Sequence, residues 1–166
     1  MNKNFIKTVS AVVLGLCVLI MLYSLASLIM EAALSEDLIN IGSTSVYETV
    51  YFVKWSATGL VCLLVPAFAS AAFAYFGKNK FLPVIAALMF FFVAASAFGF
   101  IAKVREIAGA NSTAYAAATG YMQELLQLAI PAILIGVYFI IIAVKAFSIK
   151  QISEVTKGEA QNEEII

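Results

Sequence analysis

Four long apolar stretches, separated by short polar ones, make up most of the chain. Each runs for about twenty residues or more with few charged side chains, which is the length that an α-helix needs to cross a hydrocarbon core of about 30 Å. Residues 1–157 are therefore expected to form an all-α transmembrane domain, and the polar residues 158–166 a flexible C-terminal tail. The predicted transmembrane helices cover residues 6–34, 44–76, 81–108 and 114–149.

The four residues Gly77, Lys78, Asn79 and Lys80 form the shortest connection between two of the apolar stretches. Glycine and asparagine tolerate the left-handed backbone conformation that a sharp reversal uses, so the second and third helices are expected to form a tight hairpin. Pro83 follows in the first turn of the third helix, where its missing N–H leaves no helical hydrogen bond unmade. With polar reversals between the other helices, the sequence predicts an antiparallel four-helix bundle.

The charged residues are sorted between the two ends of this bundle. Because lysine and arginine beside an apolar span are held on the cytoplasmic side, the end richer in them is expected to face the cytoplasm. That end holds both termini and the turn at residues 77–80. It carries seven of the ten basic residues, namely Lys3, Lys7, Lys78, Lys80, Lys145, Lys150 and Lys157. The sequence thus predicts a multi-pass protein of a plasma membrane or bacterial inner membrane, with both termini cytoplasmic and helices that extend past the outer membrane face.

The composition agrees with a membrane protein and argues against several functions. Apolar residues make up 63% of the 166 residues and charged residues 12%, against about 45–50% and about 25% in soluble domains. Histidine is absent, which removes the commonest metal ligand and general base, and no basic stripe suits nucleic acid. Cys17 and Cys62 lie within apolar spans, so buried, unreactive thiols are expected. We therefore expect no cofactor, no metal and no nucleic-acid partner.

The central parts of the predicted spans carry no acidic or basic side chains, and this bears on mechanism. Proton relays, ion-coupled transport and most intramembrane catalysis use a buried carboxylate, histidine or cation. The sequence therefore favours a non-enzymatic structural or accessory subunit that associates with itself or with a larger membrane complex through its transmembrane helices. The alternative is a homo-oligomeric pore lined by mild polar groups such as Ser56, Thr58, Ser70, Ser96 and Gln127.

Small residues recur four positions apart in each predicted helix. Such pairs let helices approach closely in lipid, where hydrophobicity gives little drive to associate. The expected helix-packing pairs are Ala11 and Gly15, Ala67 and Ala71, Ala95 and Gly99, and Ala132 and Gly136. Pro66 and Pro131 lie inside the second and fourth helices and are expected to kink them, because each removes a backbone hydrogen bond.

Charged residues near the expected outer surface come from all four helices. Two acids and three bases would form a collar at similar depth: Glu31, Lys54, Lys103, Arg105 and Glu124. In one interpretation the collar is a vestibule that selects an ion or a lipid headgroup. In the other it anchors the helix ends at the interface, with long side chains lying along apolar surface. Deeper in the third helix, phenylalanines 90–92 cover most of the helix circumference, so at least one is expected to face lipid or a partner.

Overall fold

The computed structural model describes residues 3–38, 44–77, 79–109 and 112–163, and within these ranges it contains helices and no strand. The prediction of an all-helical chain with four membrane-length helices is confirmed. The helices are α1 (Lys3–Leu38), α2 (Thr44–Phe76), α3 (Leu82–Ala108) and α4 (Ser112–Glu163). Each contains a segment long and apolar enough to cross a membrane, at Ala11–Met30, Tyr51–Phe76, Leu82–Ala108 and Ala118–Ser148.

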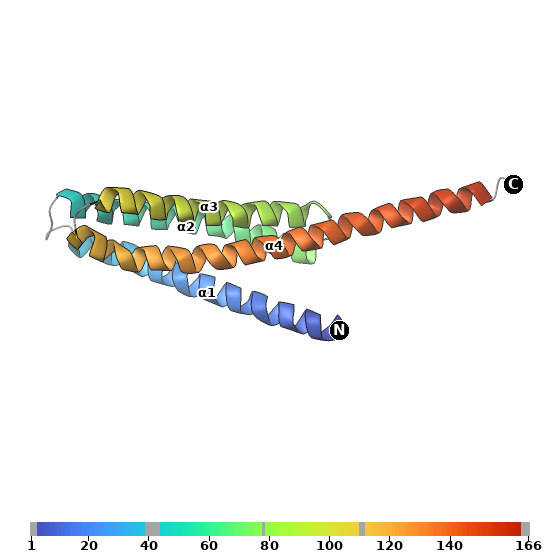
Figure 1. Ribbon diagram of the computed structural model, residues 1–166, viewed down its shortest axis with the longest axis horizontal. Coiled ribbons are helices and arrows are strands. Elements are labelled where there is room, and N and C mark those ends of the chain that lie inside the picture. The colour runs from blue at the N-terminus through green and yellow to red at the C-terminus, as the bar shows by residue number, and fades with distance from the viewer. Residues whose placement is uncertain (1–2, 39–43, 78, 110–111, 164–166) are drawn as a thin grey trace.

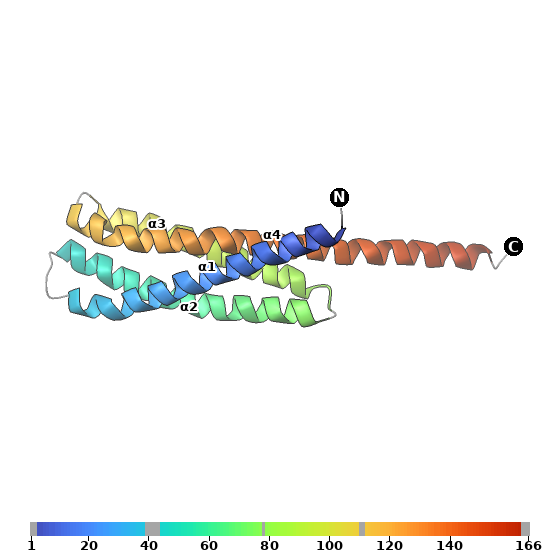
Figure 2. The same cartoon turned by 90° about the horizontal axis from the view of Figure 1, so that it is seen from below.

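The helices lie side by side, with their connected ends gathered at two opposite ends of the protein (Figures 1 and 2). The end of α1, the start of α2, the end of α3 and the start of α4 lie together at what we call the loop end. The start of α1, the end of α2 and the start of α3 lie at the opposite end, the turn end. Helices α2, α3 and α4 stay together, whereas α1 moves away from them towards its N-terminus (Figure 1).

Helix α4 is longer than the sequence indicates. It continues to Glu163, past the predicted end at residue 149 and through part of the stretch expected to be a flexible tail. It projects beyond the turn end as a single helix (Figure 2). The residues after Ser148 include several good helix formers and no proline, and the single Gly158 disfavours a helix by only about 1 kcal/mol. Local propensity therefore carries the helix onward after its apolar stretch has ended.

Buried residues of α3 recur at intervals of three and four, as in helices that pack with a slight left-handed crossing. Half of them are alanines, and their small side chains allow close approach of the neighbouring helices. The set is Pro83, Ala86, Ala87, Phe90, Val93, Ala94, Ala97, Ile101, Val104 and Ala108. This helix packs against α2 and α4, and those two helices also contact α1.

The predicted outward-facing phenylalanine is present in α3. Phe90 is fully buried, Phe91 is half-buried and Phe92 is exposed. The ring of Phe90 lies edge-on to Phe68 of α2, at 5.7 Å between centroids, and is stacked with Phe139 of α4 at 6.3 Å. Offset and edge-to-face rings at these separations attract one another, so this trio joins three helices.

The turn at the end of α2 forms for a different reason from the predicted one. Among the described residues only Gly109 has a positive φ, so the left-handed backbone expected at Gly77 and Asn79 is wrong. Gly77 is instead required by close approach, because a Cβ atom there would lie 2.5 Å from the carbonyl oxygen of Phe73. The Asn79 carboxamide oxygen accepts a hydrogen bond from the Phe81 N–H at 3.0 Å, and Pro83 falls in the first turn of α3 as predicted. An asparagine side chain bonded to the backbone two residues on, and a glycine without room for a side chain, thus replace left-handed geometry.

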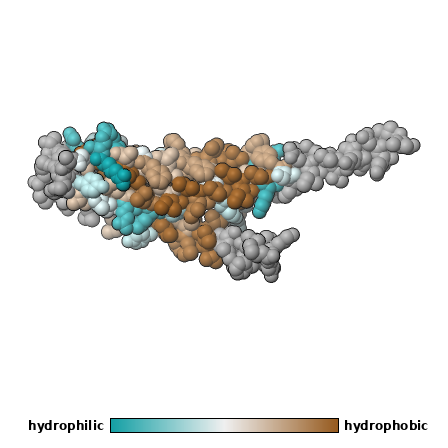
Figure 3. Space-filling view, viewed as in Figure 1, coloured by the Kyte–Doolittle hydropathy of each residue, from teal (hydrophilic) through white to brown (hydrophobic). Residues whose placement is uncertain are grey.

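The surface agrees with a protein that sits in a bilayer. Figure 3 shows an apolar band across the middle of one face, with hydrophilic residues at both of its margins. Large hydrophobic side chains are exposed on every helix, including Leu19, Val65, Phe92 and Leu134. A water-soluble protein rarely exposes so large a continuous apolar surface. The fold therefore supports a multi-pass membrane protein.

Candidate functional site

Three side-chain hydrogen bonds join α4 to α1 and α2 in the loop-end half of the protein. They involve two hydroxyls of α1, one of α2 and three polar side chains of α4. We call this group the polar cluster, and it consists of Ser24, Ser27, Ser56, Tyr121, Glu124 and Gln127. On α4 its members are spaced by three residues, which places them along one side of the helix.

Helix α1 is bonded to α4 at two successive positions. The Ser27 hydroxyl donates to Glu124 Oε1 at 3.1 Å, and the Ser24 hydroxyl donates to Gln127 Oε1 at 3.5 Å. Ser24 is fully buried. The two serines are three residues apart, as are their two partners, so the contacts repeat with the helical turn. Together they fix the register of α1 against α4.

Helix α2 is bonded to α4 through Ser56 and Tyr121, which are both buried. The Ser56 hydroxyl donates to the carbonyl oxygen of Val53 at 3.1 Å. A serine has a single hydroxyl proton, so the Tyr121 hydroxyl is the donor in the hydrogen bond between the two side chains. Tyr121 is the largest fully buried side chain in the described part of the protein, and this bond satisfies its polar end inside the core.

Glu124 brings a carboxylate into the interior with one oxygen unused. Its Oε2 atom is buried, and no described protein group donates a hydrogen bond to it. An oxygen in this position can accept a hydrogen bond from water. Within the described residues, no three cysteine, aspartate or glutamate side chains lie close enough together to hold a metal ion. The hydrogen bonds of the polar cluster can hold α1 and α2 against α4 and orient them.

The residues of the predicted collar lie in different surroundings. Lys103 and Arg105 are exposed, and Lys103 pairs with Glu106 of its own helix at 2.9 Å. Glu124 faces inward and accepts its hydrogen bond from Ser27 of α1. Lys54 is half-buried, and the side chain of Glu31 lies outside the described residues. The acid at position 124 thus belongs to the polar cluster, while the α3 bases lie on the surface.

The predicted small-residue pairs divide into two groups. Ala132 and Gly136 are buried, and a Cβ atom on Gly136 would lie 3.2 Å from the ring of Phe91. Ala67 is also buried, and Ala71, four positions further along α2, is half-buried. The pairs Ala11 and Gly15 in α1, and Ala95 and Gly99 in α3, are exposed, and both glycines have open space where a Cβ atom would be.

The candidate pore-lining groups do not share one environment. Thr58 is exposed and donates to the carbonyl of Lys54, while Ser70 is half-buried and donates to that of Ala67. Ser56 and Gln127 take part in the polar cluster, and Ser96 is half-buried in α3. Thr58 and Ser70 therefore bond within α2, whereas Ser56 and Gln127 also bond to another helix.

The two cysteines differ in their exposure, and so do the two prolines. Both cysteines are free, but Cys62 is exposed, so the expectation of two buried thiols is wrong for that residue. Position 62 lies on the exposed side of α2. A residue can lie within an apolar span and still be on the exposed side of its helix. Pro66 is exposed and Pro131 is buried, and the helix continues past each of them.

Sequence reasoning missed Ser24, Ser27 and Tyr121. The signal that could have found them is the three-residue spacing of polar side chains within otherwise apolar helices. It occurs as Ser24 and Ser27 in α1 and as Tyr121, Glu124 and Gln127 in α4. Polar groups repeated on one side of a lipid-embedded helix are expected to bond to a neighbouring helix.

Comparison of the chain with protein families, with curated proteins and with solved structures finds no match.

Proposed function

We propose that this chain is a non-enzymatic membrane subunit that associates with itself or with a larger membrane complex through the N-terminal half of its first transmembrane helix. One observation carries the proposal. In residues 11–20 of α1 only Cys17 is buried, and the exposed side includes the small pair Ala11 and Gly15. In residues 21–30 the same helix is held by Met21, Ser24 and Leu28, which are all fully buried.

The physical reason is that lipid and aliphatic side chains attract an apolar helix about equally. A helix in a bilayer therefore stays with its neighbours where small residues allow close contact or where polar groups bond. Helix α1 has such bonds in residues 21–30. Towards its N-terminus it moves away from the other helices (Figure 1), and Ala11 and Gly15 are exposed. The surface around Gly15 is thus a packing face that a second protein helix can occupy.

The proposed topology is an antiparallel bundle with both termini in the cytoplasm of a bacterial or plasma membrane, and with helix ends that project past the outer face. The support is the distribution of lysines, which favours the cytoplasm for the turn end. A cysteine introduced at Asn79, in a variant without Cys17 and Cys62, should react with an impermeant reagent only from the cytoplasmic side. Labelling from the outside would reverse the proposed orientation.

The association is tested by measuring the mass of the purified protein in mild detergent by light scattering. We expect an assembly of more than one chain, or a stable complex with another membrane protein. Gly15→Leu should dissociate it while leaving the helix content unchanged, because nothing lies within 4 Å of the new Cβ atom. Gly99→Leu is the matched control, since that glycine is equally open but belongs to a helix that stays packed between α2 and α4.

The outcomes separate the proposal from its alternatives. A monomer with no partner would contradict it, and dissociation by Gly99→Leu alone would move the interface to α3. Liposomes containing the protein should be silent in assays of ion and dye flux. A closed ring that conducts would instead support the homo-oligomeric pore.

A further inference from the structure

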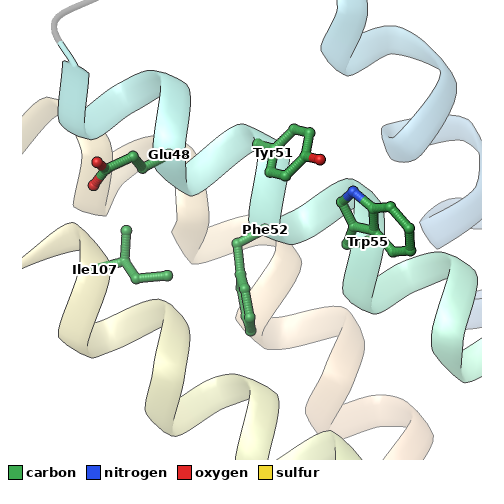
Figure 4. A pocket seen from close by; sticks show the side chains of 5 residues that line it. All are labelled: Glu48, Tyr51, Phe52, Trp55 and Ile107. Carbon is green, nitrogen blue, oxygen red and sulfur yellow. The ribbon is translucent and has the colours of Figure 1, made fainter.

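An open hollow lies between α2 and α3 at the loop end. Its volume is about 420 Å³, and it is lined by Glu48, Tyr51, Phe52, Trp55 and Ile107. The first four residues project from two successive turns of α2, and Ile107 faces them from α3 (Figure 4). The walls are therefore mostly aromatic and aliphatic, with one carboxylate at the rim.

The aromatic side chains are arranged to form a surface. The rings of Tyr51 and Trp55 have centroids 6.4 Å apart and are tilted by 59°, and both side chains are more than half exposed. Phe52 is half-buried and lies edge-on to Phe100 of α3 at 6.0 Å, which fixes the floor of the hollow. Aromatic faces carry negative charge density, so they attract a cation placed within about 6 Å of a ring.

The charge of the hollow has one sign. Glu48 is exposed and is the charged side chain among the described residues that line it. The nearest basic residues along α3 are Arg105 and Lys103, two and four positions before Ile107. Neither lines the hollow, and the Lys103 ammonium group pairs with Glu106. A carboxylate beside aromatic rings suits an ammonium group and repels an anionic one.

The position of the hollow indicates what occupies it. The membrane-length segment of α2 begins at Tyr51, so the aromatic residues lie at its boundary and Glu48 lies just outside it. Tryptophan and tyrosine favour this interfacial level, where lipid headgroups meet acyl chains. A hollow on the lipid-facing side at this depth is open to a phospholipid molecule, whose headgroup would lie near Glu48 and whose upper acyl chain would lie against Phe52 and Ile107.

We propose that this hollow binds a phospholipid whose headgroup carries an ammonium group, in preference to an anionic phospholipid. Glu48 contacts the ammonium group, and Tyr51 and Trp55 provide the aromatic surface beside it. A second hollow, of about 280 Å³ between α3 and α4, is lined by Val84, Ala87, Leu88, Phe91, Ile140, Ala143, Val144 and Phe147. Without a polar lining residue it offers no means of choosing among headgroups. The inference rests on the membrane placement in the proposed function and adds to it a defined lipid site.

Trp55 makes the site measurable, because it is the only tryptophan in the sequence. The protein is reconstituted into vesicles of phosphatidylethanolamine and phosphatidylglycerol in equal amounts. In one sample the ethanolamine lipid carries bromine atoms near the carbonyl ends of its acyl chains, and in the other the glycerol lipid carries them. The two samples then contain the same lipids in the same proportions. The difference between them in quenching of Trp55 fluorescence therefore reports which lipid occupies the hollow. Both leaflets contain both lipids, so protein orientation does not matter.

We expect quenching to favour the brominated ethanolamine lipid, with a relative association constant of about two- to fivefold, as for an exposed ion pair. Glu48→Gln should make the two lipids quench equally. Glu106→Gln is the matched control, because it removes an exposed carboxylate that does not line the hollow, and it should keep the preference.

Other outcomes would overturn the inference. Equal quenching in the unmodified protein, or a preference for the glycerol lipid, would mean that the hollow does not select an ammonium group. Loss of the preference in Glu106→Gln would assign it to general surface charge. An absence of quenching by either brominated lipid would contradict the membrane placement itself, and with it the proposed function.

Discussion

The two halves of the protein are held together by different interactions. In the loop-end half, α4 is hydrogen-bonded to α1 through Ser27 and Glu124 and to α2 through Ser56 and Tyr121. In the turn-end half, α3 and α4 are joined by aromatic contacts. There Phe81 lies edge-on to Phe147 at 5.6 Å, and the Lys80 ammonium group lies 5.5 Å and 5.1 Å from these two rings.

The difference shows why α1 is held more closely in residues 21–30 than in residues 11–20. Its serines lie in residues 21–30 and bond to α4, whereas residues 11–20 have aliphatic side chains together with small residues and Cys17. In a bilayer, an aliphatic side chain gains little by leaving lipid for another aliphatic side chain. The polar contacts and the buried residues beside them therefore decide where the helix is held. Under the proposed function, the exposed remainder is available to another protein.

The largest expected effect comes from comparing two leucines of α1. Leu28 is fully buried in the loop-end half, and Leu16 is 55% exposed in the turn-end half. Leu28→Ala should lower the free energy of unfolding by about 2 kcal/mol or more, because it leaves a cavity that neighbours fill only partly. Leu16→Ala should change it by less than about 0.5 kcal/mol. Unfolding by dodecyl sulfate in mixed micelles measures both values, and equal losses would contradict the described difference between the halves.

A smaller effect is expected from the hydroxyl of Tyr121. Tyr121→Phe keeps the ring in the core and removes the donor to Ser56, so stability should fall by about 0.5–1.5 kcal/mol. Tyr138→Phe makes the same change on a half-buried tyrosine nearer the turn end of α4, and a change of under about 0.5 kcal/mol is expected there. The same unfolding assay applies. If the second variant lost as much stability as the first, the polar cluster would have no special part in holding α4.

The smallest effect concerns the surface charges of the loop end. Lys103→Met removes the exposed pair with Glu106, and pairs of this kind contribute about 0.2–0.5 kcal/mol. The loss should shrink further at high salt, because exposed charges are screened. Thermal unfolding at low and high ionic strength measures it. A loss larger than that of Tyr121→Phe would mean that surface charges, and not buried hydrogen bonds, hold this half together.

The number of helices follows from the sequence because apolar length alone determines which segments can cross a membrane. The position of the tight turn follows as well, although Gly77 serves it through close approach to Phe73 and not through left-handed backbone. The direction in which each residue faces is harder to predict. When a helix is apolar on every side, its pattern gives little indication of which side is buried. The sequence places Glu124 near the outer end of the bundle without indicating which side of α4 it lies on, and in the structure it accepts a hydrogen bond from Ser27 of α1.

The most direct test of the central claim uses a photoreactive amino acid at two exposed positions of α1. Leu16 lies in the half that leaves the other helices, and Met30 lies in the half that is held by them. After irradiation of membranes that contain the protein, we expect a cross-linked protein product from position 16 and little or none from position 30. The product would be a dimer of this chain or a complex with another membrane protein. Cross-linking only to lipid at position 16, or equal protein products from both positions, would contradict the claim that the free half of α1 is the association face.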